Sequence, residues 1–300
     1  MTGDVATLDD AAEEFGTARR RLFGIAYRML GSAAEAEDVV QETWVRWQTT
    51  DRTVVRNPQA FLTTTATRLA INVLQSARSR REAYVGPWLP EPVDTSADPT
   101  LGAERAEALD VAVLVLLERL TPTERAAYVL REAFDYGYAE IARIVGTTPA
   151  AARQLVSRAR KDLASGRRNT VRTADRRALL EAFLAAARAG DVAALERLFA
   201  DDVVSRSDSD GRAKHVARVA VRGRTKVARL LSAFADEFWA GVTTRPVVAN
   251  GTEAVGMVRD GELVGVLSVT ASDDGVHELA WQLNPEKLAG YRQALQDPPA

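Results

Sequence analysis

A basic stretch near the middle of the chain carries side chains suited to binding a nucleic acid. Thr148-Pro149 opens a helix there, because threonine caps helix starts and proline is tolerated in the first turn. In a helix that enters a DNA major groove, the N-terminal half meets base edges and the later cations meet phosphates. Arginine suits a bidentate contact to guanine, and glutamine one to adenine. The pattern predicts base contacts from Arg153, Gln154 and Ser157, and phosphate contacts from Arg158, Arg160 and Lys161.

The residues before this helix complete a helix-turn-helix pattern. Residues 121–124 form a capping box with proline at the first helical position, and residues 138–146 form a short amphipathic helix that ends in glycine. A short helix, a glycine-containing turn and a basic helix are typical of DNA-binding proteins. The alternative is an ordinary helical hairpin with a solvated basic face. Arg160 could equally pair with Glu140 or Asp162.

Length and composition limit the classes of protein that the chain can represent. Three hundred residues favour about two or three domains. The 39 basic and 41 acidic residues give a formal net charge of −2, so the chain as a whole is not a polybasic protein that coats nucleic acid. The absence of cysteine excludes disulfides, thiolate zinc sites and cysteine nucleophiles, and two histidines leave little for a metal site. We therefore expect neither a metal nor a cofactor.

The N-terminus indicates where the protein works. It contains Asp4, Asp9 and Asp10 and lacks the apolar run of a secretory signal. No stretch approaches the roughly 18 apolar residues of a membrane helix. We expect a cytoplasmic protein without a membrane partner.

The first part of the chain reads as helices with two polar faces. Apolar spacing predicts a helix at residues 15–30, a capping box opens another at residues 32–47, and Asn57-Pro58 opens a long helix that reaches about Arg81. The second of these helices carries an acidic face that could bind a protein or simply be solvated: Glu37, Asp38, Gln41 and Glu42. The long helix carries a polar and basic set toward its C-terminal end: Asn72, Arg78, Arg80 and Arg81.

The remaining chain contains two linkers and an α+β segment. Residues 84–100 are rich in proline, as in a linker, but the large apolar side chains of Trp88 and Leu89 favour burial. We infer that this linker docks on another surface; the alternative is that Trp88 packs only locally. A polar, basic linker follows at residues 165–173. Three helices are then predicted at 174–189, 192–200 and 225–239, and four strands at 244–249, 254–258, 263–271 and 276–283. Asn-Gly and Asp-Gly turns favour hairpins between the strands, in a curved antiparallel sheet.

Several of these segments resemble a known family. Residues 36–44, residues 58–62 with 70–72, and the helix-turn-helix resemble a bacterial sigma factor of the extracytoplasmic-function group, over residues 12 to about 164. Two further motifs resemble those of its sigma-J-like subgroup: Trp88-Leu89-Pro90-Glu91-Pro92 and Asn284-Pro285-Glu286-Lys287-Leu288. Asp208-Ser209-Asp210-Gly211-Arg212 is similar to a third, looser motif. The subgroup carries a C-terminal SnoaL-like domain, a cone-shaped α+β fold related to nuclear transport factor two.

The resemblance implies a multidomain architecture. Two all-α sigma domains, a helical bundle and a helix-turn-helix, would precede the α+β cone. The implied domains are region 2 at 12–83, which binds core polymerase and the −10 element, a linker at 84–102, region 4 at 103–166, which binds the −35 element, and the SnoaL-like domain at 174–289.

The resemblance also implies a division of labour. Bacterial core RNA polymerase would bind the acidic face at residues 37–42, and promoter DNA would bind the two basic sets. The chain would have no chemistry of its own and would act as a monomer when free. The C-terminal domain would modulate activity in cis through motif residues: Trp88, Leu89, Pro90, Glu91, Pro92, Asp210, Gly211, Arg212, Asn284, Pro285, Glu286, Lys287 and Leu288.

Alternatives to this interpretation stay open. Leu155 stands where many such recognition helices carry a basic residue, so the sequence that the helix reads can differ from the family pattern. The protein could be a helix-turn-helix regulator that does not bind polymerase. It could also be a SnoaL-like enzyme on a DNA-binding scaffold, and a small-molecule ligand could occupy the C-terminal pocket. The candidate catalytic residues are Asp208, Asp210, His215, Trp239 and Trp281.

Overall fold

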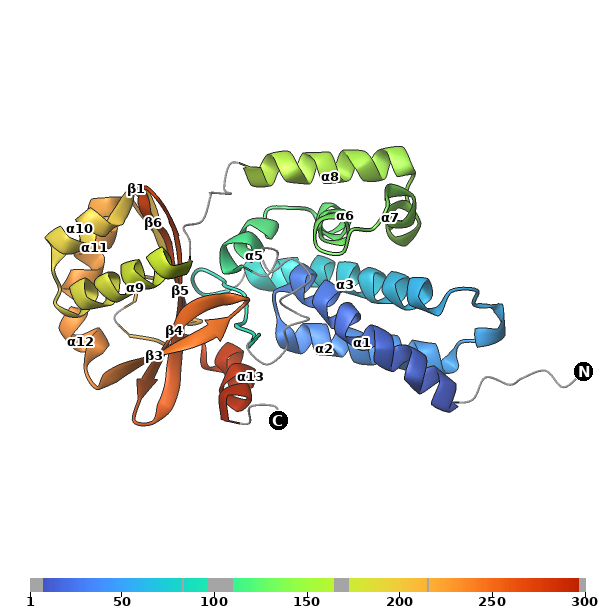
Figure 1. Cartoon of the computed structure of the whole chain (residues 1–300), viewed down its shortest axis with the longest axis horizontal. Helices are drawn as coiled ribbons and strands as arrows, with labels where there is room; N and C mark the ends of the chain where they lie inside the picture. Colours follow the sequence, from blue (N-terminus) through green and yellow to red (C-terminus); the bar gives the residue numbers. More distant parts are fainter. Residues whose placement is uncertain (1–7, 83, 96–109, 165–172, 215, 297–300) are drawn as a thin grey trace, which may run out of the picture. The chain divides into compact units, whose positions relative to one another are not determined.

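The structure is a computed structural model that describes residues 8–82, 84–95, 110–164, 173–214 and 216–296. At residues 8, 77–82, 173–176 and 294–296 it describes the backbone alone. The chain divides into two compact units (Figure 1), one with residues 1–82, 100–109 and 116–166 and the other with 83–99, 110–115 and 167–300. Within the described ranges, no helix is long and apolar enough to cross a membrane.

Helices build the first unit. They are α1 (Leu8–Leu30), α2 (Ala33–Thr49), the 3-10 turn η1 (Arg52–Val54), α3 (Pro58–Glu82), α6 (Pro122–Glu132), α7 (Tyr138–Val145) and α8 (Pro149–Ala164). The residues of α5 (Val111–Leu117) are divided between the two units. Each start that the capping signals predict is present; the Ser32 hydroxyl, for example, accepts the Glu35 N–H at 3.1 Å before α2.

Trp47 on α2 ties the first three helices together. Its side chain is fully buried, its indole N–H donates to the Ala11 carbonyl of α1 at 3.2 Å, and its ring lies 5.4 Å from that of Phe61 on α3. A buried indole needs a partner for its N–H, so this hydrogen bond makes burial of the large ring favourable. The acidic face of α2 is therefore presented by a fixed helix.

The helix-turn-helix is built as its caps predict. Thr121 and Glu124 complete the capping box of α6, and Gly146 ends α7 in the left-handed conformation at φ 73°. Glycine adopts that conformation without steric cost, which allows the chain to turn at once into α8. The buried side of α8 is apolar and consists of Ala152, Val156, Ala159 and Leu163. Burial of that side fixes which face of α8 remains outside.

Hydrogen bonds join the three-helix bundle to the helix-turn-helix within the first unit. The Arg68 guanidinium on α3 donates to the carbonyl oxygens of Ile144 at 2.9 Å and Arg143 at 3.1 Å, at the C-terminal end of α7. A cation is favourable at that end of a helix, where carbonyl groups lack helical partners. The buried Arg125 on α6 donates to the Met29 carbonyl of α1 at 2.6 Å. The first unit is thus one packed body.

The second unit surrounds a six-stranded sheet. Its elements are α9 (Thr173–Arg188), α10 (Val192–Leu198), β1 (Phe199–Asp208), β2 (Val221–Arg222), α11 (Arg224–Ala233), α12 (Ala235–Trp239), β3 (Val242–Ala249), β4 (Thr252–Arg259), β5 (Glu262–Ser272), β6 (Gly275–Gln282) and α13 (Pro285–Gln296). The strand order is β2-β1-β6-β5-β4-β3. This confirms the prediction that an α+β fold follows an all-helical first part.

One strand differs from the expectation of a purely antiparallel sheet. β1 pairs in parallel with β6, and the other pairings are antiparallel. No strand was expected over 201–208, because Ser205, Ser207 and Asp208 give the segment no apolar periodicity. All three are nevertheless buried. Polar partners from other segments compensate the burial of Ser205 and Asp208.

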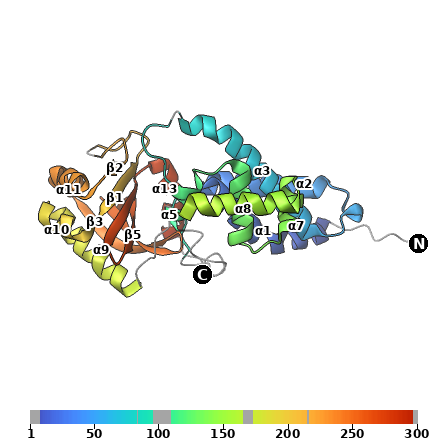
Figure 2. The same cartoon turned by 90° about the horizontal axis from the view of Figure 1, so that it is seen from above.

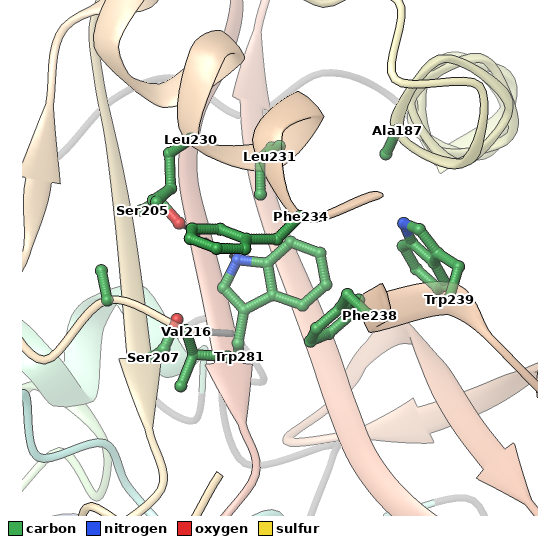
Figure 3. Close-up of a pocket in the computed structure, with 11 residues that line it drawn as sticks. Ala187, Ser205, Ser207, Val216, Leu230, Leu231, Phe234, Phe238, Trp239 and Trp281 are labelled. Carbon is green, nitrogen blue, oxygen red and sulfur yellow. Dashed lines mark hydrogen bonds between the residues drawn. The ribbon is translucent and has the colours of Figure 1, made fainter. Parts of the chain in front are cut away.

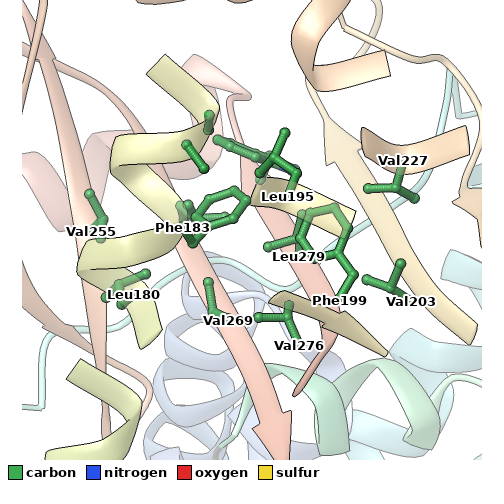
Figure 4. Close-up of a cluster of buried hydrophobic side chains, with 14 of the residues drawn as sticks. Leu180, Phe183, Leu195, Phe199, Val203, Val227, Val255, Val269, Val276 and Leu279 are labelled. Atoms are coloured by element: carbon green, nitrogen blue, oxygen red, sulfur yellow. The ribbon is translucent and has the colours of Figure 1, made fainter. Parts of the chain in front are cut away.

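Helices pack on both faces of the sheet. One face carries the main core, in which Phe183 of α9 and Leu195 of α10 meet Phe199 and Leu279 of the sheet (Figure 4). On the other face, Leu288 and Tyr291 of α13 pack against β3, β4 and β5. Figure 2 shows α9, α10 and α11 on the side of the sheet opposite α13. The sheet is covered on both sides, which holds α13 and the motif at its start against the strands.

Gly275 is required at the turn into β6. Its φ is +113°, and a Cβ atom there would lie 2.6 Å from the Leu198 carbonyl oxygen and 3.1 Å from the Ala200 nitrogen. We expect Gly275→Ala to lower the free energy of unfolding of the second unit by about 2 kcal/mol, because both contacts are to backbone. Urea unfolding followed by tryptophan fluorescence measures the loss.

Gly290 provides the matched control. It is exposed within α13, and no atom lies within 4 Å of the position of an added Cβ. Gly290→Ala should leave stability unchanged or raise it by up to about 1 kcal/mol, since alanine is the better helix former. An unfolding midpoint that Gly275→Ala does not lower would contradict the account of this turn.

Candidate nucleic-acid interface and linker-binding site

The predicted DNA-contacting side chains of α8 share its exposed face. Because Ala152, Val156, Ala159 and Leu163 are buried, the helical periodicity turns the intervening polar residues outward. All six predicted contact residues are exposed: Arg153, Gln154, Ser157, Arg158, Arg160 and Lys161. The acidic Asp162 is exposed beside them. Leu155 is half-buried, so it belongs to the edge of the core rather than to the polar face. The face matches the size and chemistry of a helix surface that enters a groove.

Some cations on this face are held by neighbouring helices. The Arg153 guanidinium lies 5.2 Å from the ring centroid of Tyr138, and Arg158 lies 3.7 Å from Glu124. Arg160 pairs with Glu132 of α6 at 2.7 Å, and this hydrogen bond raises the pKa of Arg160. The expected alternatives, Glu140 and Asp162, are therefore not its partner. The Glu140 carboxylate instead accepts the backbone N–H of Gly137 at 3.0 Å and closes the capping box of α7.

The acidic face of α2 combines charge with an apolar edge. Asp38, Gln41 and Glu42 are exposed and Glu37 is half-buried. Glu37 pairs with Arg19 at 2.7 Å and Glu42 with Arg46 at 2.8 Å. Exposed ion pairs of this kind are weak and can exchange for a partner's cations. Val45, one helical turn after Gln41, is 51% exposed and gives this face an apolar edge that was not predicted. The signal in the sequence is an apolar residue four positions after a residue of the polar face.

The basic end of α3 is described in part. Asn72 is exposed on the helix. Arg78, Arg80 and Arg81 continue the helix, and their side chains lie outside the described residues. Arg68, a further basic residue of α3, donates to the carbonyls at the end of α7. That arginine joins the two helical halves.

The Pro-rich segment expected as a linker is bound to the second unit through a buried carboxylate. Asp208 is 0% exposed at the end of β1. Its carboxylate accepts the Leu89 backbone N–H at 2.7 Å, the Lys287 ammonium at 2.7 Å and the hydroxyl of Tyr84. Lys287 also donates to the Leu89 carbonyl at 2.7 Å. These groups form what we call the Asp208 network.

The motif at the start of α13 surrounds this network. The Asn284 side chain donates to the Tyr84 hydroxyl at 2.8 Å and caps α13 by accepting the Glu286 N–H at 3.0 Å. The Lys287 ammonium lies 4.2 Å from the ring centroid of Trp88, close enough for a cation–π contact. Burial and the Asp208 carboxylate raise the pKa of the Tyr84 hydroxyl, which keeps its proton available for donation.

The other motif residues extend the attachment of the segment. The Gln282 amide donates to the Pro90 carbonyl at 3.1 Å. The Asn250 backbone N–H donates to the Val93 carbonyl at 2.9 Å, and the Val93 N–H donates to the Asn250 side-chain oxygen at 3.2 Å. The sequence predicts Asn250 only as part of an Asn-Gly hairpin turn. In the structure it is also fully buried at φ 55°, so its polar groups need such partners. Gln282 likewise lies outside the motifs that the sequence analysis singled out.

Another turn of the motif set lies beside α13. Asp210 and Gly211 adopt positive φ angles of 49° and 70°, and a Cβ at Gly211 would lie 3.0 Å from Val85. Arg212 then pairs with Glu286 at 2.7 Å. Glu91 and Pro92 are part of the attached segment. Pro285 is the first residue of α13, and Leu288 of the same helix is fully buried against the sheet.

An aromatic pocket opens beside β1 and β6 in the second unit (Figure 3). Trp239, Trp281, Phe234 and Phe238 line it, and the Trp281 indole donates to the Ser205 hydroxyl at 3.1 Å. Its cavity volume is about 30 Å³, far below that of a pocket for a drug-sized ligand. No described lining residue is an acid or a base, so this lining offers no general acid–base pair.

The other candidate catalytic residues are occupied or undescribed. Asp208 is committed to the linker segment, and His215 lies outside the described residues. His277 stands between the Ser272 hydroxyl at 2.6 Å and the Asp202 carboxylate at 3.2 Å, which is the order of a hydrolase triad. Ser272 also accepts the Asp274 N–H at 3.2 Å in the turn between β5 and β6, so these contacts brace a hairpin.

Comparisons with known proteins give the class and the family. The family model "Sigma-70 region 2" matches residues 15–80, and "Sigma-70, region 4" matches residues 110–163. These two helical regions and the exposed basic α8 define an RNA polymerase sigma factor. The chain is 38% identical over 297 residues to "ECF RNA polymerase sigma factor SigJ" of Mycobacterium tuberculosis, covering 92% of this chain and 93% of the relative. It belongs to the extracytoplasmic-function sigma factors of the SigJ type.

Other comparisons agree with this assignment. "Probable ECF RNA polymerase sigma factor SigI" of M. tuberculosis is 31% identical over 195 residues, which cover 64% of this chain and 67% of that protein. The crystal structure of M. tuberculosis SigJ superimposes with a TM-score of 0.73 at 34% identity, covering 93% of this chain and 98% of that one. The predicted family and fold class are confirmed. These relatives are sigma factors, not enzymes.

The exposed face of α8 leads to a prediction about two arginines. If Arg153 reads one base pair of the upstream element, Arg153→Ala should lower transcription only at promoters that carry the preferred base pair there. The lost discrimination between that base pair and the others should be about 1–3 kcal/mol. Arg160→Ala should lower transcription at all promoters alike, because its bond to Glu132 holds α8 on α6. Transcription from a set of single-base promoter variants measures both, and an equal loss for Arg153→Ala at every promoter would reassign it to phosphate.

Proposed function

We propose that this sigma factor divides promoter recognition between separate helices of its first unit. The exposed face of α8 reads the upstream promoter element, with Arg153, Gln154 and Ser157 at base edges. The C-terminal half of α3, from Asn72 onward, contacts the promoter element that melts. What supports this assignment is the burial of the opposite side of α8 and the membership of the family.

The acidic face of α2 is the proposed contact for core RNA polymerase. Asp38 and Gln41 project from a helix fixed by Trp47, and Val45 adds an apolar edge. A basic and apolar helix of the partner would complement this surface in both charge and shape. The chain would act as a single copy when free, since one copy carries both promoter-reading regions.

The second unit is the proposed regulator in cis. It contains residues from both sides of the connection between region 2 and region 4, namely 83–99 and 110–115. Leu89 and Val111 pack with Ala280 of β6 in one small apolar cluster, and the Asp208 network holds the segment at 84–89. Attachment at these points limits the distance that the connecting chain can span. The single observation that carries the proposal is the fully buried Asp208 carboxylate bound to Leu89.

A small-molecule ligand of the second unit completes the proposal. The unit has a cavity of about 560 Å³, which lies within the volume range of small-molecule pockets. Binding of a ligand there would change how firmly the segment at 84–95 is attached.

Lys287 provides the sharpest test of regulation in cis. Lys287→Gln removes the cation that meets Asp208 and the Leu89 carbonyl. We expect binding to core RNA polymerase, measured by pull-down, to change by less than about twofold. We would then compare transcription from promoters that differ only in the spacing of their two elements. The ratio between the preferred and the other spacings should fall by roughly fivefold, because one charged hydrogen-bonded contact is worth about 1–3 kcal/mol.

Matched variants separate this effect from general instability. Tyr84→Phe deletes only a hydroxyl from the Asp208 network and should shift the spacing preference in the same direction. Lys226→Gln removes an exposed lysine of α11 and should change nothing. A folded Lys287→Gln protein with unchanged spacing preference would refute the regulatory role, and failure of the wild type to bind core polymerase would refute the function itself.

A further inference from the structure

A second cavity of the α+β unit has an apolar floor and a cationic rim. It lies among α12, β3, β4, β5, the turn at 212–214 and the start of α13, and its volume is about 560 Å³. Met257, Val264 and Leu283 contribute apolar side chains, and the rim contributes arginine and lysine. The volume is in the range of ligand pockets in proteins, and it is separate from the aromatic pocket except for Phe238.

Two half-buried arginines of the rim are positioned by carbonyl groups instead of carboxylates. Arg259 donates to the carbonyls of Ala240 at 3.2 Å and Phe238 at 3.0 Å, and Arg292 donates through Nε to the Leu263 carbonyl at 2.7 Å. Among the described residues neither arginine has an ion pair. Carbonyl groups fix the guanidinium planes without neutralising their charge, so Nη1 of Arg259 and both Nη groups of Arg292 remain available for an anion.

The rest of the rim increases the positive charge. Lys214 is exposed and makes no ion pair with a described residue. Arg212 also lines the cavity, but its charge is partly neutralised, because it pairs with Glu286 at 2.7 Å and lies 3.7 Å from Asp210. Glu237 is the one acidic residue of the described lining, against four cations. A cavity with such a rim attracts negative charge.

We propose that this cavity binds an amphipathic carboxylate, a carboxylic acid whose apolar body rests on Met257, Val264 and Leu283. The two Nη groups of Arg292 match the two oxygens of a carboxylate, and Arg259 and Lys214 complete the shell around it. An uncharged analogue would leave these cations without an anion, and a cationic analogue would be repelled.

The ligand would reach the regulatory segment through Arg212. This arginine pairs with Glu286 at 2.7 Å, and Glu286 is 69% exposed. Such an exposed pair contributes little stability, so a carboxylate in the cavity can take Arg212 from Glu286. Glu286 precedes Lys287 of the Asp208 network. This link to transcription rests on the proposed regulation in cis, whereas binding of the carboxylate does not.

Calorimetric titration of the full chain tests the site directly. Decanoate, below its aggregation concentration, should bind with a 1:1 stoichiometry, and decanol and decyltrimethylammonium should bind at least roughly tenfold more weakly. Lys214→Gln and Arg292→Gln should each weaken decanoate binding by roughly tenfold. Arg197→Gln, at an exposed position of α10 outside the cavity, is the matched control and should bind like the wild type.

The outcomes separate the site from its regulatory role. Equal binding of decanoate and decanol, or unchanged binding by Lys214→Gln and Arg292→Gln, would overturn the proposal. Because Lys214 is exposed, Lys214→Gln should fold normally, and circular dichroism checks this. If regulation in cis fails in the promoter-spacing assay, the calorimetric result for the wild type and Lys214→Gln still decides whether the carboxylate site exists.

Discussion

The arrangement of the second unit depends on a single buried carboxylate. Asp208 is fully buried at the end of a strand, where an uncompensated negative charge would be very unfavourable. Its compensation comes from outside the sheet: a backbone N–H from Leu89, a hydroxyl from Tyr84 and the ammonium of Lys287. These groups lie about 120 residues before it and about 80 after it in the sequence. The charge therefore requires that a proline-rich segment and the start of α13 meet at this strand.

This requirement changes the role of the segment after region 2. A proline-rich stretch ordinarily acts as a spacer, but here residues 84–95 are bonded to the sheet at several places. Residues 110–115 belong to the same unit. The two sigma regions are therefore connected through chain that the α+β unit holds, and the proposed ligand of the cationic cavity would act on that attachment through Arg212.

Local signals in the sequence predicted much of the first unit because its structure is locally determined. Capping at Thr121 and Ser32 and the glycine after α7 specify where helices begin and end, and the apolar period of α8 specifies its outer face. The partner of Arg160 was not predictable in this way, since Glu132 is 28 residues distant and Glu140 is occupied by its own cap. The sequence also could not show that Arg68 turns toward α7 rather than toward DNA.

The second unit shows the opposite balance. Hairpin turns predicted β3 to β6, but β1 was missed because its polar residues are buried against partners distant in sequence. The sequence motifs at 88–92 and 284–288 predicted which segments meet. They did not show that Asp208, Tyr84 and Gln282 make the hydrogen bonds that join these segments. Long-range polar networks of this kind have no periodicity, so they become visible only in the folded chain.

Hydrogen–deuterium exchange of residues 84–95 is the most direct test of the Asp208 network. The account predicts slow exchange of this segment in the free wild-type chain, because the Leu89 N–H is bonded to a buried carboxylate. It also predicts fast exchange in Lys287→Gln, while the helices of the first unit exchange as before. Fast exchange of the segment in the wild type, or equal protection in both proteins, would contradict the claim that Asp208 and Lys287 hold it in place.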